Sequence, residues 1–129
     1  MGKGYLIDTN SVIDYLDNKL PEKTYEFIDG IVCQISVITR MELLAWPGAN
    51  NEQTLILKQF IKESNVFALE EQVILKAIEI RKKYKTKLPD AIIGATAIVN
   101  KLTIITRNTK DFENINDLKV LNPFELSKR

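Results

Sequence analysis

The stretch that most constrains this sequence is Tyr5-Leu6-Ile7-Asp8-Thr9-Asn10, a short apolar run that ends abruptly in a carboxylate. Helix-forming residues with an apolar period follow at once, so the segment predicts a buried strand, a turn and a helix. In alternating α/β proteins ligands gather beyond the carboxyl ends of the strands, where Asp8 would lie. The alternative is that Asp8, Thr9 or Asn10 only caps the helix, because such residues are preferred at helix N-caps.

The rest of the chain continues this alternation without an internal repeat or a linker. Further strands are expected over residues 31–35, 66–69 and 102–106, with a possible edge strand at 119–121. The run at 31–35 is apolar at nearly every position, which is typical of a central strand. We therefore predict one α/β domain over residues 1–129, with a central, mainly parallel twisted sheet of four to five strands flanked by helices.

Helix signals fill the intervals between the predicted strands. Pro21 and Gly30 bound one helix, and Pro89 opens another that is apolar on most sides and runs to Asn100. A break at Pro47-Gly48-Ala49-Asn50 precedes a helix whose buried face is expected to carry four apolar residues. These four are Leu55, Ile56, Phe60 and Ile61.

Composition is that of an ordinary globular protein, with 45% hydrophobic and 27% charged residues. The sequence contains no run of about 18 apolar residues, so no membrane span is predicted. The N-terminus does not resemble a signal peptide. Cys33 is the only cysteine, which excludes an intramolecular disulfide and suits a reducing cytoplasm. We expect it to be a small core residue, because it lies in an apolar run.

The sequence contains no histidine. This excludes Ser-His-Asp and Cys-His catalysis and the usual zinc sites. Any chemistry must therefore use carboxylates, hydroxyls, amides, lysines or bound hard metal ions. The net charge of +1 gives no overall basic field for nucleic acid, although a balanced total can hide a basic rim around an acidic pocket.

Three carboxylates, Asp8, Asp90 and Asp111, lie just past a predicted strand or at a helix start, and a fourth, Glu42, lies in the apolar helix after the second predicted strand. Each has a structural alternative, since Asp90 and Asp111 suit helix N-termini and Glu42 could face solvent beside Arg40. Asp90 lies in an otherwise nearly apolar stretch and needs a compensating partner. An arginine could serve, and so could Mg²⁺ or Mn²⁺, which bind clustered carboxylate oxygens.

These residues resemble the PIN-domain ribonucleases, specifically the VapC-type toxins of bacterial and archaeal toxin–antitoxin pairs. Four matching segments occur in the family's order from the first strand to near the end of the chain. They are Ile7-Asp8-Thr9-Asn10, Ser36-Val37-Ile38-Thr39-Arg40-Met41-Glu42-Leu43, Lys87-Leu88-Pro89-Asp90-Ala91-Ile92-Ile93-Gly94-Ala95-Thr96-Ala97 and Ile105-Thr106-Arg107-Asn108-Thr109-Lys110-Asp111-Phe112. Gly94 stands where many members have alanine.

The resemblance implies an acidic pocket of Asp8, Glu42, Asp90 and Asp111 that holds Mg²⁺ or Mn²⁺. Asp8, Asp90 and Asp111 are expected as direct or water-mediated ligands, and Glu42 as a ligand or as the group that orients the attacking water. Whether one metal binds or two stays open. The family's supporting polar positions match Asn10, Thr106 and Asn108, for which turn and cap chemistry is the alternative.

RNA needs cations along its path, and the basic run at residues 81–87 leads directly into Asp90. Possible RNA contacts are Arg40, Lys85, Lys87, Arg107 and Lys110. The alternative is that these cations complete helix ends and face water. Trp46 is expected to cover the core or to form a contact surface.

The resemblance also implies partners: an RNA substrate (tRNA, rRNA or mRNA), a cognate antitoxin that covers the acidic pocket, and a second copy in a homodimer. Exposed apolar residues on the helices after Gly48 are candidates for antitoxin binding. Three rival hypotheses remain. They are a phosphoaspartyl enzyme or receiver domain, although Asn10 replaces its second acid, a PIN-like module that binds RNA or protein without cutting, and a PIN nuclease outside toxin–antitoxin systems.

Overall fold

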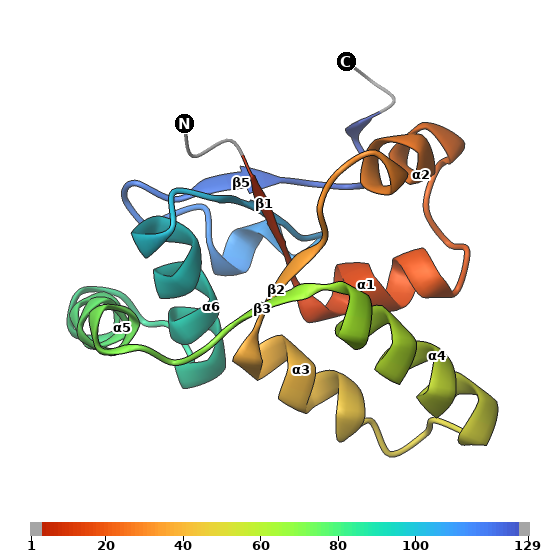
Figure 1. Cartoon of the computed structure of the whole chain (residues 1–129). Coiled ribbons are helices and arrows are strands. Elements are labelled where there is room, and N and C mark those ends of the chain that lie inside the picture. Colours follow the sequence, from red (N-terminus) through yellow and green to blue (C-terminus); the bar gives the residue numbers. More distant parts are fainter. Residues whose placement is uncertain (1–3, 127–129) are drawn as a thin grey trace.

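Strands and helices alternate along the chain in the computed structural model, which describes residues 4–126 (Figure 1). The strands are β1 (Tyr5–Ile7), β2 (Gln34–Ser36), β3 (Asn65–Phe67), β4 (Thr103–Ile105) and β5 (Lys119–Leu121). The helices are α1 (Thr9–Leu16), α2 (Glu22–Asp29), α3 (Val37–Leu44), α4 (Asn51–Glu63), α5 (Glu71–Lys83) and α6 (Leu88–Val99), with a 3₁₀ helix, η1 (Thr109–Asp111).

All strand pairings are parallel, as predicted, but the five strands divide between two ladders. One ladder has the order β1-β4-β5 and the other pairs β2 with β3. The two ladders meet where β1 contacts β2, and there the Gln34 Nε2 donates to the Tyr5 carbonyl at 3.3 Å. In the first ladder Tyr5 pairs with Thr103 and Ile7 with Ile105, so the first strand depends on one near the end of the chain.

Strands β1 and β4 are buried on both faces, and their alternate side chains enter two separate cores. Leu6 and Ile104 pack with α5 and α6, whereas Ile7 and Ile105 pack with α1, α2 and α4. This follows from the two-residue period of a strand, which points successive side chains to opposite faces. Figure 1 shows α5 and α6 on one side of the strands and α1, α2 and α4 on the other.

Helix boundaries follow local chemistry. Asn50 and Gln53 form a reciprocal capping box at the start of α4, and the Ser36 hydroxyl accepts from the Ile38 N–H to cap α3. In α6 every residue from Ala91 to Ala97 is buried, which confirms that this helix lies inside the molecule. A row of small side chains allows this close approach to neighbouring backbone.

The prediction of a strand over residues 31–35 was wrong in its first half. The strand β2 begins at Gln34, and Val32 is 73% exposed. Cys33 is half-buried at the molecule's surface and is not a core residue. The third strand is likewise shifted, since β3 ends at Phe67 and Leu69 is exposed. Apolar character in these segments reflects an open surface rather than burial in a sheet.

The buried face of α4 also differs from the prediction. Leu57 and Phe60 enter the core, whereas Leu55 is 68% and Ile56 46% exposed. Trp46 is half-buried and packs against the core cluster that includes Leu57, as expected for a residue that covers the core. The helix therefore presents large apolar side chains to solvent.

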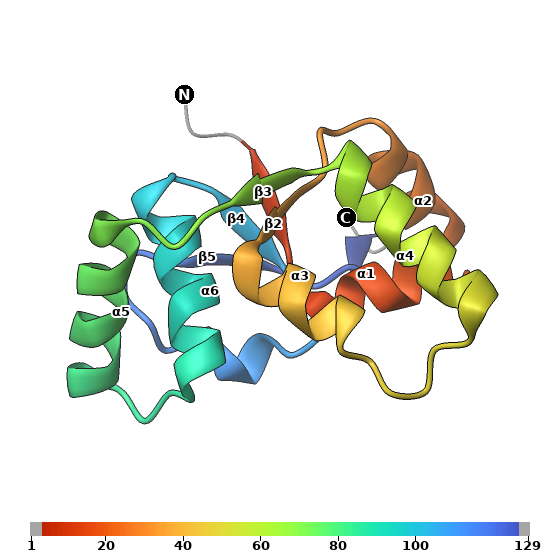
Figure 2. The same ribbon diagram turned by 60° about the horizontal axis from the view of Figure 1, so that its bottom comes forward.

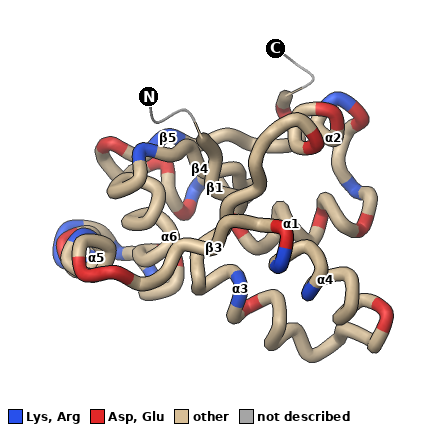
Figure 3. Tube along the Cα trace, in the orientation of Figure 1, with Lys and Arg blue, Asp and Glu red and all other residues tan. Residues whose placement is uncertain are grey.

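Strands β1 to β4 contain no charged residue, and β5 contains one, Lys119; the other charged residues lie on helices and loops (Figure 3). Within residues 4–126, no helix has both the length and the apolar character needed to cross a membrane.

Candidate functional site

Asp8 occupies the turn between β1 and α1 and is 5% exposed. Its Oδ1 accepts from the Thr9 N–H at 2.9 Å, which makes Asp8 the N-cap of α1. Its Oδ2 accepts from the Thr106 hydroxyl, also at 2.9 Å. Capping therefore accounts for one oxygen only, and the other is held by a residue that follows β4.

The pKa of Asp8 is raised above its usual value, chiefly because burial removes water from the carboxylate. The hydrogen bonds from Thr106 and Thr9 oppose this shift. Nearby negative charge on Glu42 and Asp111 adds to it. Asp8 is thus a buried acid within electrostatic range of two of the other predicted acids.

Glu42 lies on α3, which contacts both α1 and α6 (Figure 2). The Thr9 hydroxyl donates to Glu42 Oε1 at 2.6 Å and lies 3.1 Å from the Thr39 hydroxyl. Sequence reasoning gave neither threonine a role in the site. The signal was present for Thr39, which precedes Glu42 by three residues and so shares its helix face.

Asp90 lies in the first turn of α6, and Asp111 ends η1. Burial raises the pKa of Asp90 to about 6, with further contributions from the negative charges of Asp111, Asp8 and Glu42. Lys87 partly opposes these effects. The four carboxylates therefore share one electrostatic environment at the carboxyl ends of β1 and β4.

The donor chemistry of this region fits a hard divalent cation, because the available groups are carboxylate and hydroxyl oxygens. The pKa values of Asp8 and Asp90 are raised, so a cation bound nearby would stabilise their ionised forms. Among residues 4–126, however, no three acidic side chains approach closely enough to form a compact ligand group. Glu42 and Asp111 are exposed, whereas Asp8 is buried and Asp90 half-buried.

The supporting polar residues fall into different environments. Thr106 is fully buried and links Asp8 to the following loop, because its hydroxyl also accepts from the Asn108 N–H at 3.0 Å. Asn108 occupies the N-cap position of η1, but its side chain makes no capping hydrogen bond. Asn10 lies in the first turn of α1 and is half-buried.

A cleft of about 260 Å³ joins two of the acids to basic side chains. Asp90 and Asp111 line it together with Lys85, Lys87 and Lys110. Tyr84 forms part of the same wall and accepts a hydrogen bond from the Asn116 N–H. The predicted association of lysines with the acidic site is therefore present in the geometry of this cleft.

The two arginines named from sequence lie outside this cleft lining. Arg40 is exposed on α3. Arg107 is about half-exposed, and its Nη1 lies 3.3 Å from Oδ1 of the buried Asp14. Asp14 was not singled out from sequence, because an acid near the end of a short helix reads as a solvent-facing residue.

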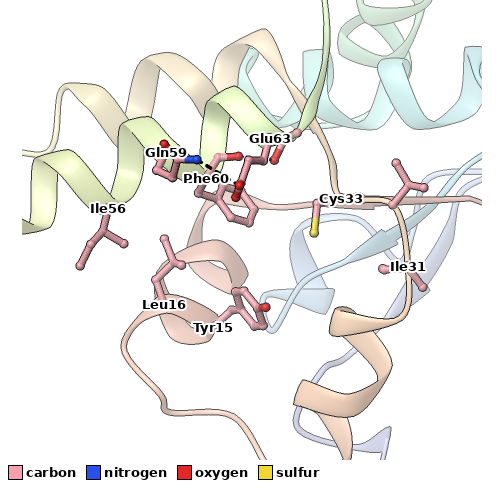
Figure 4. Close-up of a pocket in the computed structure, with 10 residues that line it drawn as sticks. Tyr15, Leu16, Ile31, Cys33, Ile56, Gln59, Phe60 and Glu63 are labelled. Carbon is pink, nitrogen blue, oxygen red and sulfur yellow. Dashed lines mark hydrogen bonds between the residues drawn. The ribbon is translucent and has the colours of Figure 1, made fainter.

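A second and larger cleft, of about 560 Å³, lies apart from the acids (Figure 4). It is bounded by α1, α4 and the segment that leads into β2. Its wall is mainly apolar and includes Tyr15, Leu16, Ile56 and Phe60, together with the half-buried Cys33. The Tyr15 hydroxyl donates to Asp29, which raises the pKa of Tyr15 to about 12.

Comparison with known proteins agrees with this architecture. The PIN domain family matches residues 5–118. The chain is 30% identical to a Ribonuclease VapC from Rickettsia bellii, over 92% of this chain and 95% of that protein. A toxin–antitoxin complex from Klebsiella pneumoniae contains a chain with 32% identity and a TM-score of 0.77, covering 95% of this chain and 100% of that one. DNA-bound VapBC from Salmonella typhimurium gives 25% identity and a TM-score of 0.81, covering 92% of this chain and 96% of that one. This chain therefore belongs to the PIN-domain family, among its VapC-like members.

Proposed function

We propose that this protein is a Mg²⁺- or Mn²⁺-dependent endoribonuclease, the toxin of a toxin–antitoxin pair. The observation that carries the proposal is the shared environment of Asp8, Glu42, Asp90 and Asp111, in which burial and like charge raise the pKa of Asp8 and Asp90. Acids held in this way suit a site whose charge is balanced by a bound cation. The relatives named above, a ribonuclease and toxin–antitoxin complexes, support the same activity.

Asp8, Asp90 and Asp111 would hold the cation, and Glu42 would hold it or orient the attacking water. When bound, the cation supplies an activated water and neutralises charge on the phosphate. The Thr106 hydroxyl fixes the Asp8 carboxylate, and the Thr9 hydroxyl fixes that of Glu42. Hydrolysis by water rather than by the RNA 2′-hydroxyl leaves a 5′-phosphate.

The lysines of the smaller cleft would bind the RNA backbone beside the reacting phosphate. Lys85, Lys87 and Lys110 share this cleft with Asp90 and Asp111, so a phosphate that approaches the acids meets positive charge first. This arrangement explains how a chain with a net charge of only +1 could attract RNA to an acidic site.

The test is incubation of the purified protein, free of antitoxin, with total cellular RNA. Reactions contain Mn²⁺, Mg²⁺ or chelator, and new 5′ ends are mapped by sequencing. We expect discrete, metal-dependent ends that bear 5′-phosphate and disappear with Asp90→Asn. Glu113→Gln, an exposed acid after η1, is the matched control and should cleave normally. A folded protein that binds Mn²⁺ but cuts no RNA would instead favour a PIN-like binding module.

We expect the antitoxin, besides covering the acids, to bind in the larger apolar cleft. It lies beside Ile56, which is 46% exposed on α4. Its volume and apolar wall suit hydrophobic side chains from a partner segment. We expect Ile56→Asp to abolish co-purification with the protein encoded beside this chain. Leu75→Asp, on the exposed side of α5, is the control and should retain the partner.

We also propose that this toxin acts in the cytoplasm and forms a homodimer. Light scattering of the purified protein, with and without its antitoxin, measures the oligomeric state. A monomer at micromolar concentration would remove the homodimer from the proposal without affecting the nuclease.

A further inference from the structure

Asp14 is a buried acid whose charge is only partly compensated. Its side chain is 3% exposed, and its Oδ1 lies 3.3 Å from Arg107 Nη1. Its Oδ2 is buried and has no hydrogen-bond partner among residues 4–126. Ser11, one turn earlier on the same face of α1, is fully buried, and its hydroxyl also has no partner there.

Such an arrangement contributes little to folding by itself. Removing a carboxylate from water costs free energy that a single contact with a half-exposed arginine only partly offsets. An apolar pair of similar size at these positions would often be as stable. The ion pair is therefore better explained as a contact that positions two segments of the chain than as a source of stability.

Arg107 lies between two residues that organise the acidic site. The preceding residue, Thr106, donates its hydroxyl to Asp8, and the following residue, Asn108, donates its N–H to that same hydroxyl. The Asn108 carbonyl then accepts from the Asp111 N–H at 3.1 Å. The ion pair between Arg107 and Asp14 therefore restrains the segment that carries both Thr106 and Asp111.

Asp14, the other member of this ion pair, is also connected to the acidic site. Asp14 belongs to α1, the helix whose first turn is capped by Asp8. A helix of this length is a rigid unit, so Asp8 and Asp14 keep a fixed relation to one another. The contact from Asp14 to Arg107 thus joins the body that carries Asp8 to the loop that carries Asp111.

We propose that Asp14 and Arg107 are positioning residues, whose ion pair fixes the 106–111 segment against α1 and so sets the placement of Asp111 relative to Asp8. This inference rests on the proposed nuclease function. It assigns Arg107 a role within the protein and so replaces its interpretation as an RNA contact. Neither residue touches the reacting phosphate.

The experiment compares Asp14→Asn, Arg107→Gln and the double variant Asp14→Asn/Arg107→Gln with the wild-type protein. Asp17→Asn is the matched control, because it makes the same change at the C-cap of the same helix, at a residue paired with Lys19 at 3.9 Å. Three quantities are measured: kcat and KM on a short RNA that contains the mapped cleavage site, the urea midpoint of unfolding, and hydrogen exchange of the Asn108 and Asp111 amides.

We expect Asp14→Asn to lower kcat by about 10- to 100-fold, the loss associated with displacement of a catalytic group by about 1 Å, with KM unchanged. Exchange at the Asn108 and Asp111 amides should become faster. Arg107→Gln should also lower the urea midpoint, because it leaves the buried Asp14 unpaired. The double variant should recover the urea midpoint, because it removes the buried charge. It should not recover kcat, because the ion pair is still absent.

Two outcomes overturn the proposal. If the double variant recovers both the urea midpoint and kcat, the pair serves stability alone. If Arg107→Gln raises KM while Asp14→Asn changes neither kcat nor amide exchange, Arg107 contacts RNA directly. Amide exchange does not depend on nuclease activity. A wild-type protein that cuts no RNA would therefore refute the proposed nuclease function, and the exchange rates would still show whether the ion pair fixes the 106–111 segment.

Discussion

Replacement of Asp90 by asparagine should stabilise the metal-free protein at neutral pH while it abolishes function. The pKa of Asp90 is raised from 3.8 to about 6, mainly by burial and by the charges of Asp111, Asp8 and Glu42. Because the folded state holds this proton more tightly than the unfolded state, stability is lost as the pH rises from 3.8 through about 6. At pH 7.5 the wild-type protein carries the full cost of ionising this group, and Asp90→Asn does not.

The magnitude follows from the same shift. Each pKa unit corresponds to about 1.4 kcal/mol, which sets a ceiling of about 3 kcal/mol. Asp90 is only partly buried, so solvent screening reduces this to about 1 kcal/mol. At pH 4.5 most of the folded wild-type protein already carries the proton, and the gain should fall to about a third of its value at pH 7.5.

The assay is urea unfolding in chelator at pH 4.5, 6.0 and 7.5, with Glu113→Gln as a surface-acid control. Repetition at pH 7.5 with saturating Mg²⁺ should stabilise the wild-type protein and leave Asp90→Asn unchanged, because only the former retains the complete set of acids. An Asp90→Asn protein that is less stable than wild type at pH 7.5 would refute the electrostatic reasoning. So would a gain of equal size at pH 4.5 and 7.5.

Three further predictions concern single side chains. Thr106→Val should lower the free energy of unfolding by about 1–3 kcal/mol, because it leaves a buried oxygen of Asp8 without its hydrogen-bond donor. Thr106→Ser should retain most of that stability in the same urea experiment. Gly94→Ala should raise the free energy of unfolding by about 0.8 kcal/mol, since a Cβ there meets only ordinary contacts, the nearest at 3.6 Å. Gly4→Ala, whose Cβ would lie 2.7 Å from a neighbouring side chain, should give no such gain in the same urea measurement. Lys110→Gln should reduce the slope of log KM against log salt concentration by about 0.7, the value for one lost contact to single-stranded RNA, and an unchanged slope would exclude Lys110 from the RNA path.

The alternation of strands and helices could be predicted from sequence because strong local signals mark each element. Pro89 in the first turn and an unbroken apolar run define α6, and the run that ends at Asp8 defines β1. The strand prediction was wrong over residues 31–33 because an apolar run can either pack inside a sheet or line an open cleft. Residues 31–33 line an open cleft, and the sequence alone does not distinguish this from a buried strand.

The acids of the candidate site could be named from the sequence, but their hydrogen-bond partners could not. Asp8, Glu42, Asp90 and Asp111 could be named from their positions after strands and at helix starts, together with the family resemblance. The hydrogen bonds from Thr9 and Thr106 were not predictable, since each joins segments that meet only in the folded chain. Asp14 was missed for the same reason, because the residue that covers it is Arg107, 93 positions later.

The parallel pairing of β1 with β4 also governs when the protein can act during its own synthesis. Asp8 leaves the ribosome early, but the hydroxyl that holds it belongs to a residue 98 positions further on. Until Thr103–Ile105 have emerged, the first strand has no partner in its ladder, and the acids cannot assemble. If the proposed nuclease function holds, a chain that ends before β4 would therefore be inactive, because Asp8 would lack the hydroxyl that holds it. Contacts so distant in sequence also form slowly, which would leave an interval between completion of the chain and assembly of the proposed site.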